Sequence, residues 1–410
     1  MKYTPPPAAA GRFNTAWAEL AALGRDGRRG GYSRHVFDDA DMQMREWFSA
    51  QATRRGLDVE LDRNGNLWAW WGTPGPGAVV TGSHFDSVPG GGAFDGPLGI
   101  VSSLLAIDEM RVRGIVPAKP VALVCFAEEE GGRFGLPCLG SRLMTGAAEA
   151  EHVRRLHDPD GVSFADAARR IGFDITHLGR DADRLANIGA FVELHVEQGR
   201  LLHAADPTAA IGVGSQIVAH GRWRITVTGE GNHAGTTKPD DRHDPMIPAA
   251  AAILAARRSL ALHDGAVATI GRLQPIPGGT NVIASSVDAW MDVRHGGAAE
   301  TAALVDEIVA AVREEAELEG CSVVVHRESL SDAVMFDATL TMDLALQLDA
   351  PVIPTGAGHD AGILAAHVPS TMLFVRNPTG ISHAPGEHAE TSDCLLGVDA
   401  LADVLAELVR

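Results

Sequence analysis

The pattern of hydrophobic and polar residues changes twice along the chain. In residues 1–211, apolar runs alternate with amphipathic stretches, as in proteins where strands and helices follow one another. Runs typical of buried strands lie at residues 79–83, 120–127 and 188–196, and helices are expected at 39–55 and 98–110. Asn64-Gly65 between two apolar runs predicts a β-hairpin. This order predicts an α/β sheet, in which ligands gather beyond the carboxyl ends of the strands.

Residues 212–329 follow a different order, βαββαβ, which predicts a ferredoxin-like domain. Its strands are expected at 223–227, 267–273, 286–293 and 322–326, and its helices at 245–262 and 300–318. On the first strand, Trp223, Ile225 and Val227 alternate with polar residues, as in a sheet with one solvated face. The α/β pattern resumes over residues 330–410. We therefore expect a smaller domain inserted between two segments of a larger one.

Composition and charge exclude several classes of protein. The formal net charge of -19 repels phosphate backbones and anionic lipid surfaces, so we expect neither a nucleic-acid nor a membrane partner. The longest nearly apolar run, 246–256, is far shorter than a bilayer span, and residues 1–7 lack the apolar core of an export signal. Four widely spaced cysteines without a CxxC pair disfavour a disulfide framework and a thiolate zinc site. We expect a cytoplasmic protein.

Histidines and carboxylates stand where the predicted strands end. His84 ends one strand, and Asp86 lies on the same face two residues later, where its carboxylate can accept a hydrogen bond from the imidazole. Asp95 follows in a loop that enters a helix, His195 ends the strand at 188–196, and His383 lies in a loop far along the chain. Imidazole and carboxylate ligands without thiolate fit zinc, manganese, cobalt or nickel. An aspartate that bridges two such ions is a common hydrolytic centre.

Three acids, Glu128 to Glu130, follow the apolar strand at 120–127. Neighbouring side chains on a strand point apart, so one carboxylate can bind metal while the next faces a substrate. A solvated acidic turn is the alternative. The apolar strand before the acids and the double glycine after them favour a site. The remaining histidines, among them His203, His243, His295 and His388, are expected to be ordinary surface or core residues.

Seven strings of residues, in this order, resemble the dinuclear M20-type amidohydrolases. The strings are GSHFDSVPGGGAFDGPLG, EEEGGRFG, ELHVEQG, GNHAGTT, GGTNVI followed by DVR, GAGHDAG, and SHAP. The chain is most similar to the branch of N-carbamoyl-L-amino-acid hydrolases, β-ureidopropionases and allantoate amidohydrolases, and the resemblance covers nearly its whole length. It implies a mixed-sheet metallohydrolase domain interrupted by an inserted lid that also dimerises, and hence a homodimer.

The resemblance also implies roles for single residues. The implied ligands of two divalent ions per subunit, with zinc favoured over manganese, cobalt or nickel, are His84, Asp95, Glu130, His195 and His383. Glu129 is implied as the general base and His233 as a catalytic residue of the lid. The implied substrate-binding residues are Gln198, His220, Asn281 and Arg294, the lid residues coming in part from the partner subunit. The chain departs from the branch around His220 and at Lys238-Pro239-Asp240, which bears on specificity.

The implied reaction splits the ureido C–N bond of a small carboxylate-bearing substrate and releases ammonia. N-carbamoyl-L-amino acids, N-carbamoyl-β-alanine and allantoate all fit. A hydroxide shared by two metals would attack the carbonyl, Glu129 would take the proton of the water and pass it to the leaving nitrogen, and His233 would hold the oxyanion. Arg294 suits a bidentate grip on a carboxylate.

Two other functions fit parts of the sequence. An aminoacylase or dipeptidase would keep the metals and cleave an ordinary amide. A metal- or amino-acid-binding protein without activity is the second, and Glu129 argues against it. A dinucleotide site at residues 356–362 is disfavoured because no GxGxxG stands between a strand and a helix. His359 in that segment can lie beside the metals or cap a helix, and the capping role is favoured.

Overall fold

The computed structural model describes residues 7–410, so residues 1–6, considered above for an export signal, lie outside the described part. The chain forms two compact units. The larger one comprises Met1–Gln216 and Met335–Arg410, and the inserted unit comprises Ile217–Val334. The expected boundaries at 212 and 329 fall slightly too early, because the strand β6 (Ile211–Ile217) belongs to the sheet of the larger unit.

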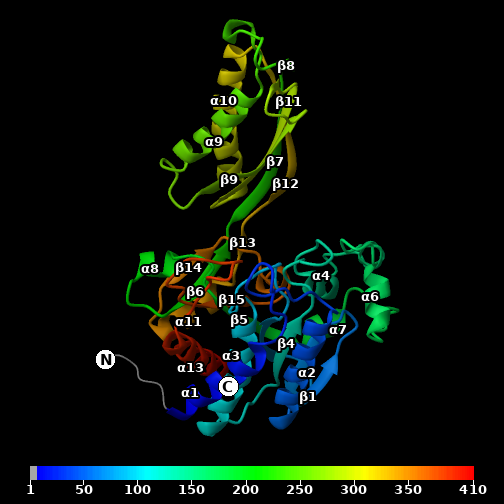
Figure 1. Cartoon of the computed structure of the whole chain (residues 1–410). Helices are drawn as coiled ribbons and strands as arrows, with labels where there is room; N and C mark the ends of the chain where they lie inside the picture. The colour runs from blue at the N-terminus through cyan, green and yellow to red at the C-terminus, as the bar shows by residue number, and fades with distance from the viewer. Residues whose placement is uncertain (1–6) are drawn as a thin grey trace. The chain divides into compact units, whose positions relative to one another are not determined.

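The larger unit is built on a nine-stranded mixed sheet (Figure 1). Its remaining strands are β1 (Asp58–Leu61), β2 (Leu67–Trp71), β3 (Ala78–His84), β4 (Val121–Phe126), β5 (Ile188–Val196), β13 (Val334–Met335), β14 (Val352–Thr355) and β15 (Ser370–Val375). Its helices are α1 (Pro7–Leu20), α2 (Asp39–Arg54), α3 (Pro97–Val112), α4 (Leu139–Thr145), α5 (Ala150–Arg154), α6 (Phe164–Arg170), α7 (Ala182–Asn187), α8 (Leu201–Ala205), α11 (Ala338–Leu348), α12 (Asp360–Leu364) and α13 (Thr391–Leu408).

The strand order places four chain segments at one edge of this sheet. The order is β1-β2-β4-β3-β5-β15-β6-β13, with β14 also paired to β6. The central strands β4, β3, β5 and β15 run parallel to one another, and the antiparallel β2 and β6 flank them. The carboxyl ends of the four parallel strands therefore meet at the same edge, which is where an α/β sheet binds its ligands.

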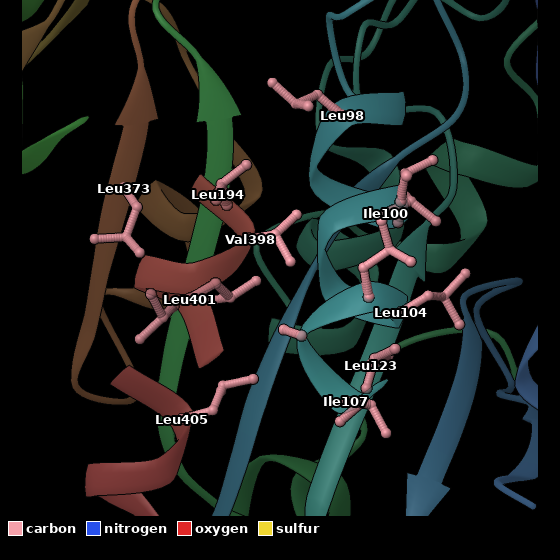
Figure 2. Packing of buried hydrophobic residues seen from close by; sticks show 14 of the residues in the cluster. Leu98, Ile100, Leu104, Ile107, Leu123, Leu194, Leu373, Val398, Leu401 and Leu405 are labelled. Atoms are coloured by element: carbon pink, nitrogen blue, oxygen red, sulfur yellow. The ribbon is translucent and has the colours of Figure 1, made fainter. Parts of the chain in front are cut away.

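Helices α3 and α13 form the main hydrophobic core with the central strands. Both pack against each other and contact the sheet. Figure 2 shows apolar side chains of α3, such as Leu104, and of α13, such as Leu401, meeting Leu123, Leu194 and Leu373 of the strands. All five of these residues are buried. Because the parallel strands are covered here, their sequences read as continuous apolar runs.

The inserted unit is a four-stranded antiparallel sheet in the order β12-β7-β11-β9. Its elements are β7 (Ala219–Thr228), β8 (Asn232–His233), a short 3-10 helix (Pro239–Asp241), α9 (Met246–Ser259), β9 (Val267–Ile276), β10 (Val282–Ile283), β11 (Ser286–His295), α10 (Ala298–Leu318) and β12 (Ser322–Ser331). Helices α9 and α10 cover one face (Figure 1). The βαββαβ order with this pairing confirms the ferredoxin-like prediction. Within residues 7–410, no helix has both the length and the apolar character required to cross a membrane.

Candidate active site

The predicted ligands come together at the carboxyl edge of the large sheet. His84 and His195 stand at the ends of β3 and β5, and Glu130 follows β4. His383 lies in the loop after β15, where its φ of 55° is left-handed, a conformation that non-glycine residues rarely adopt outside functional sites. Asp95 lies in the loop between β3 and α3. A Cβ on Gly96 would lie 2.5 Å from the His84 ring, so only glycine lets this loop approach the histidine so closely.

Asp95 stands between two groups of possible ligands. Its Oδ1 lies 3.2 Å from Nε2 of His195 and 3.6 Å from Nε2 of His84, and its Oδ2 lies 3.4 Å from Nε2 of His383. The first group is Asp95 with the two buried histidines, and the second is Asp95 with Glu130 and His383. In each group the ligand atoms lie within 4.8 Å of one another. A carboxylate placed in this way can bridge two ions.

The hydrogen bonding of these residues fits metal ligands. Nδ1 of His84 bonds to the backbone carbonyl of Asp86 at 2.9 Å, and Nδ1 of His195 bonds to that of Val196 at 2.8 Å. These bonds place the ring proton on Nδ1 and leave the lone pair on Nε2. Both Nε2 atoms, with Oδ1 of Asp95 and Oε1 of Glu130, are buried without a hydrogen-bond partner. Such atoms are costly unless a ligand satisfies them. Burial lowers the pKa of His84 to about 4, which favours the neutral imidazole that metal binding requires. Burial also acts to lower the pKa of His195, but the carboxylate of Asp95 outweighs it and raises this pKa to about 9, so a metal ion would displace a proton there.

The carboxylate of Asp86 makes different hydrogen bonds from the one that was predicted. The carboxylate was expected to accept the imidazole proton, but its Oδ1 lies 3.7 Å from His84, and the backbone carbonyl takes that role. The carboxylate instead accepts the backbone N–H groups of Glu129 at 3.1 Å and of Glu130 at 2.9 Å. Strand β3 ends at His84, so Asp86 lies outside the strand. The alternation that would place the side chains of His84 and Asp86 on the same face does not extend to Asp86. Asp86 therefore holds the acidic loop after β4.

Glu129 lies beside the two groups of ligands and belongs to neither of them. Its Oε2 is 3.7 Å from Nε2 of His84, and the thiol of Cys138 donates a hydrogen bond to its Oε1 at 3.6 Å. The side chain is buried. Burial and the nearby charge of Glu130 raise its pKa well above the usual value of a glutamate. A buried carboxylate with a raised pKa next to a ligand cluster is suited to accept a proton.

Two further predicted residues reach the cluster. Gln198 donates from Nε2 to Oδ2 of Asp95 at 2.9 Å and lies 3.2 Å from Nε2 of His383. His359 occupies the N-cap position of α12, but its side chain makes no capping hydrogen bond, so the favoured capping role is wrong. Its buried ring lies 4.6 Å from the ring of His195, and neither of its nitrogens has a hydrogen-bond partner.

The sequence reasoning missed two buried glutamates in this region. Glu193 accepts hydrogen bonds from Oγ of Ser83 at 3.0 Å and from the backbone N–H of Ala361 at 3.1 Å. The alternation of β5, which places Glu193 and His195 on one face, was a usable signal for it. Glu387 accepts the backbone N–H of Asp95. No local pattern pointed to Glu387, because its partner lies 292 positions away in the sequence.

The four residues of the inserted unit that were expected to contact the substrate form two pairs. His220 on β7 and Arg294 on β11 are directly opposite in the strand register, and Nε of Arg294 donates to Oδ1 of Asp292 at 2.9 Å. Burial and the charge of Arg294 lower the pKa of His220. The second pair is His233 and Asn281: β8 pairs with β10, and the N–H of Ala234 donates to the carbonyl of Asn281 at 3.1 Å.

These two pairs lie in different sheets of the inserted unit: His220 and Arg294 belong to the four-stranded sheet, whereas His233 lies on β8, and Asn281 directly before β10, of the separate two-stranded sheet. In the strand register, Arg294 and His220 lie eight positions from Ser286 and Thr228. The short strands β8 and β10 adjoin Ser286 and Thr228 in the sequence, because β8 follows Thr228 and β10 precedes Ser286. At about 3.3 Å per residue, eight positions along a strand correspond to about 26 Å. A substrate the size of an amino acid is much smaller than that.

Comparisons with known proteins agree with this geometry. The family model for peptidase family M20/M25/M40 matches residues 80–407. The N-carbamoyl-L-amino acid amidohydrolase of Geobacillus stearothermophilus is 33% identical over 408 residues, which cover 96% of this chain and 98% of the relative. The allantoate amidohydrolase of Escherichia coli strain K12 is 33% identical over 404 residues, covering 95% of each chain.

A solved structure extends the similarity to the whole fold. The crystal structure of an amidase of the hydantoinase/carbamoylase family from Burkholderia multivorans superposes with a TM-score of 0.87 at 30% identity, covering 98% of each chain. The match therefore includes the inserted unit as well as the large sheet. The resemblance drawn from the seven strings of residues is confirmed. The chain belongs to peptidase family M20/M25/M40, in the branch of the N-carbamoyl-L-amino-acid and allantoate amidohydrolases.

Proposed function

We propose that this protein is a metal-dependent amidohydrolase that cleaves the ureido C–N bond of a small carboxylate-bearing substrate and releases ammonia. The substrate class comprises N-carbamoyl-L-amino acids and related ureido acids such as allantoate and N-carbamoyl-β-alanine. The observation that carries the proposal is Asp95, which stands between a group of completely buried histidines with unsatisfied Nε2 atoms and the group of Glu130 and His383, in a chain whose relatives are named for this chemistry.

The cofactor in this proposal is a pair of divalent ions, with zinc favoured over manganese, cobalt or nickel because the donors are imidazole and carboxylate. His84 and His195 would hold one ion, Glu130 and His383 the other, and Asp95 would serve both. When bound, the ions supply Lewis acidity, which lowers the pKa of a water molecule and polarises the ureido carbonyl.

Glu129 is the general base in this proposal. Its buried carboxylate takes a proton from the attacking water and returns it to the leaving nitrogen. Two contacts support this role. Cys138 holds one oxygen of the carboxylate, which leaves the other beside His84 and the ligand cluster. Gln198, hydrogen-bonded to Asp95, lies where it can contact a substrate at the same centre.

The inserted unit supplies the grip on the substrate. Arg294 is oriented by Asp292 and would bind the substrate carboxylate, beside His220 on the neighbouring strand. His233 would stabilise the developing oxyanion, and Asn281 would add a directional hydrogen bond. Because the two-stranded sheet of β8 and β10 adjoins the end of β11 that is opposite to Arg294, we propose that His233 and Asn281 reach the site of the partner subunit.

We also propose a homodimer through the inserted unit, because the proposed contact of His233 and Asn281 with the partner's site would require one. Large hydrophobic side chains are exposed along α9, among them Ile253 at 42% and Leu254 at 60% exposure. A helix with such residues on its surface is suited to an interface between copies of the chain. We propose that the inserted unit serves as both lid and dimerisation domain, and that the protein acts in the cytoplasm, as its spaced, unpaired cysteines favour.

The test is an ammonia-release screen on the purified, metal-reconstituted protein. The substrates are N-carbamoyl-L-amino acids, N-carbamoyl-β-alanine and allantoate, with N-acetyl amino acids and dipeptides as controls. We expect ammonia from at least one ureido acid, loss of activity on chelation, and recovery when a divalent metal is added back. Hydrolysis of the acetyl or peptidyl compounds alone would assign the protein to the aminoacylase or dipeptidase class instead. Absence of any hydrolysis by the metal-loaded protein would favour a binding protein.

A further inference from the structure

Glu387 is a buried carboxylate on the loop that carries His383. Only 5% of its surface is exposed. Its Oε1 accepts two backbone N–H groups, from Phe94 and from Asp95, both at 3.0 Å. Its Oε2 lies 3.4 Å from Oγ of Ser382, next to His383. One side chain thus connects the loop of one ligand with the backbone of the bridging ligand.

The chain is shaped to admit this carboxylate. A Cβ on Gly92 would lie 2.1 Å from Oε1 and 2.3 Å from Cδ of Glu387, much closer than any van der Waals contact. Any other residue at position 92 would displace Glu387 from the two N–H groups. The glycine is therefore a second, independent indication that the position of the carboxylate is important.

Asp86 makes the same type of contact elsewhere in the site. It follows His84 by two residues and accepts the backbone N–H groups of Glu129 and Glu130. In both cases a carboxylate from one ligand-bearing loop holds the backbone of another. The two contacts connect three chain segments, namely the loop between β3 and α3, the acidic loop after β4 and the loop of His383, into one frame around the ligands.

We propose that Glu387 is a positioning residue that sets the metal affinity of the site by fixing the backbone, and with it the side chain, of Asp95. This inference rests on the metal centre of the proposed function. Residues that orient metal ligands typically change affinity by about 10- to 100-fold when they are removed. Asp95 is the ligand common to both groups, so misplacing it weakens the binding of both ions.

The experiment measures zinc affinity by competition with a chelator, together with the metal content of the purified protein. Glu387→Ala is expected to bind zinc about 10- to 100-fold more weakly than the wild type. Glu387→Gln keeps an oxygen that can accept both N–H groups and is expected to retain most of the affinity. Glu390→Ala, which removes an exposed carboxylate three residues away, is the matched control and should leave the affinity unchanged.

A second variant tests the same contact without removing the carboxylate. Gly92→Ala should weaken zinc binding as Glu387→Ala does, whereas Gly11→Ala, at a glycine with open space around it, should have no effect. Melting curves of the metal-free proteins show which variants are folded, and Gly92→Ala decides the question if Glu387→Ala does not fold. Zinc affinity within about threefold of wild type in a folded Glu387→Ala or Gly92→Ala protein overturns the proposal.

Zinc affinity is measured without a substrate, so this result is separate from that of the ammonia screen. Loss of affinity in the two variants would stand even if no ureido acid were hydrolysed. Conversely, an active enzyme whose Glu387→Ala variant binds zinc normally would refute the role of Glu387 and leave the proposed function in place.

Discussion

The residues at the edge of the large sheet and those of the inserted unit are placed very differently. His84 and His195 are completely buried, and their ring nitrogens lie within 4 Å of a single carboxylate, that of Asp95. His233, in contrast, is exposed and lies in the separate two-stranded sheet of β8 and β10, whereas Arg294 lies on β11, about 26 Å along that strand from the end next to β10. The first set is already assembled within one chain. The second set is spread over two separate sheets of the inserted unit.

We infer from this difference that the residues of the larger unit carry out bond cleavage, whereas those of the inserted unit determine which substrate is bound. The buried set has fixed partners and unsatisfied atoms, as expected for a preorganised metal centre. In the inserted unit His233 is exposed and Arg294 is partly buried, and we propose that these residues contact the substrate rather than the metal ions. Variants in the two regions should therefore affect different kinetic constants, and the following predictions test that division.

The largest effect is expected for Glu129→Gln. The amide keeps the shape of the side chain but cannot accept the proton of the attacking water, so kcat should fall about 100- to 10,000-fold. Metal content should stay at the wild-type level, because Glu129 belongs to neither group of ligands. Ammonia release and metal analysis of the same preparation measure both quantities.

An exposed carboxylate provides the control for that variant. Glu149→Gln removes a negative charge from the surface and should leave kcat and metal content unchanged. A Glu129→Gln protein whose kcat stays within a few-fold of wild type would remove Glu129 as the base. A Glu129→Gln protein without metal would show instead that this residue helps to form the centre, and the division between ligands and base would then be wrong.

A smaller effect, mainly on KM, is expected for Arg294→Ala. Hydrogen bonds to a charged group contribute about 1.5–3 kcal/mol, so the apparent affinity for carboxylate substrates should fall about 10- to 100-fold. The change in kcat should be smaller, because the carboxylate is bound equally in the ground state and the transition state. Arg294→Lys keeps the charge without the planar fork and should be intermediate.

Arg327→Ala is the matched control, since Arg327 is an exposed arginine of the same unit, on β12. It should not change KM. An Arg294→Ala enzyme with unchanged KM for carboxylate substrates would contradict the proposed role of the inserted unit in binding them. The same fall in kcat for both Arg294→Ala and Glu129→Gln, with KM unaltered, would contradict the separation of chemistry from selectivity.

Features that depend on local sequence could be predicted well. The strand expected at 188–196 has those bounds in the structure, and the hairpin around Asn64-Gly65 is the antiparallel pair β1 and β2. In both cases apolar runs and turn residues determine the element within a few neighbouring positions. The clustering of His84, Glu130 and His195 could also be predicted, because these residues lie near strand ends and the parallel order of the strands brings those ends together, whereas Asp95 and His383 lie farther along in loops.

Features that depend on long-range pairing could not be predicted. Strand β6 joins the large sheet through β15, a pairing between segments about 160 residues apart, and the domain boundary was therefore placed too early. The contact of Glu387 with the backbone of Asp95 depends on the path of a distant loop. The separation of Arg294 from His233 became evident only when the strand register was known, because sequence motifs give order along the chain and no distance in space.

The smallest change in activity is expected in mixed dimers. These dimers also test most directly the comparison between the residues of the larger unit and those of the inserted unit. A dimer of one Glu129→Gln chain and one His233→Ala chain, purified with two different tags, combines two defects. If His233 acts in the partner's site, one site of the dimer has an intact Glu129 and an intact His233 from the opposite chain, so about half of the wild-type activity per dimer should return. If His233 acts within its own chain, both sites are defective, and activity stays at the level of the single variants.

The control is a mixed dimer of one Glu129→Gln chain and one Gln198→Ala chain. Both residues belong to the larger unit, so each site still contains one defect, and no activity should be gained over the Gln198→Ala homodimer. Recovery in the first dimer without recovery in the second would assign the chemistry to the larger unit of one chain and the oxyanion contact to the inserted unit of the other.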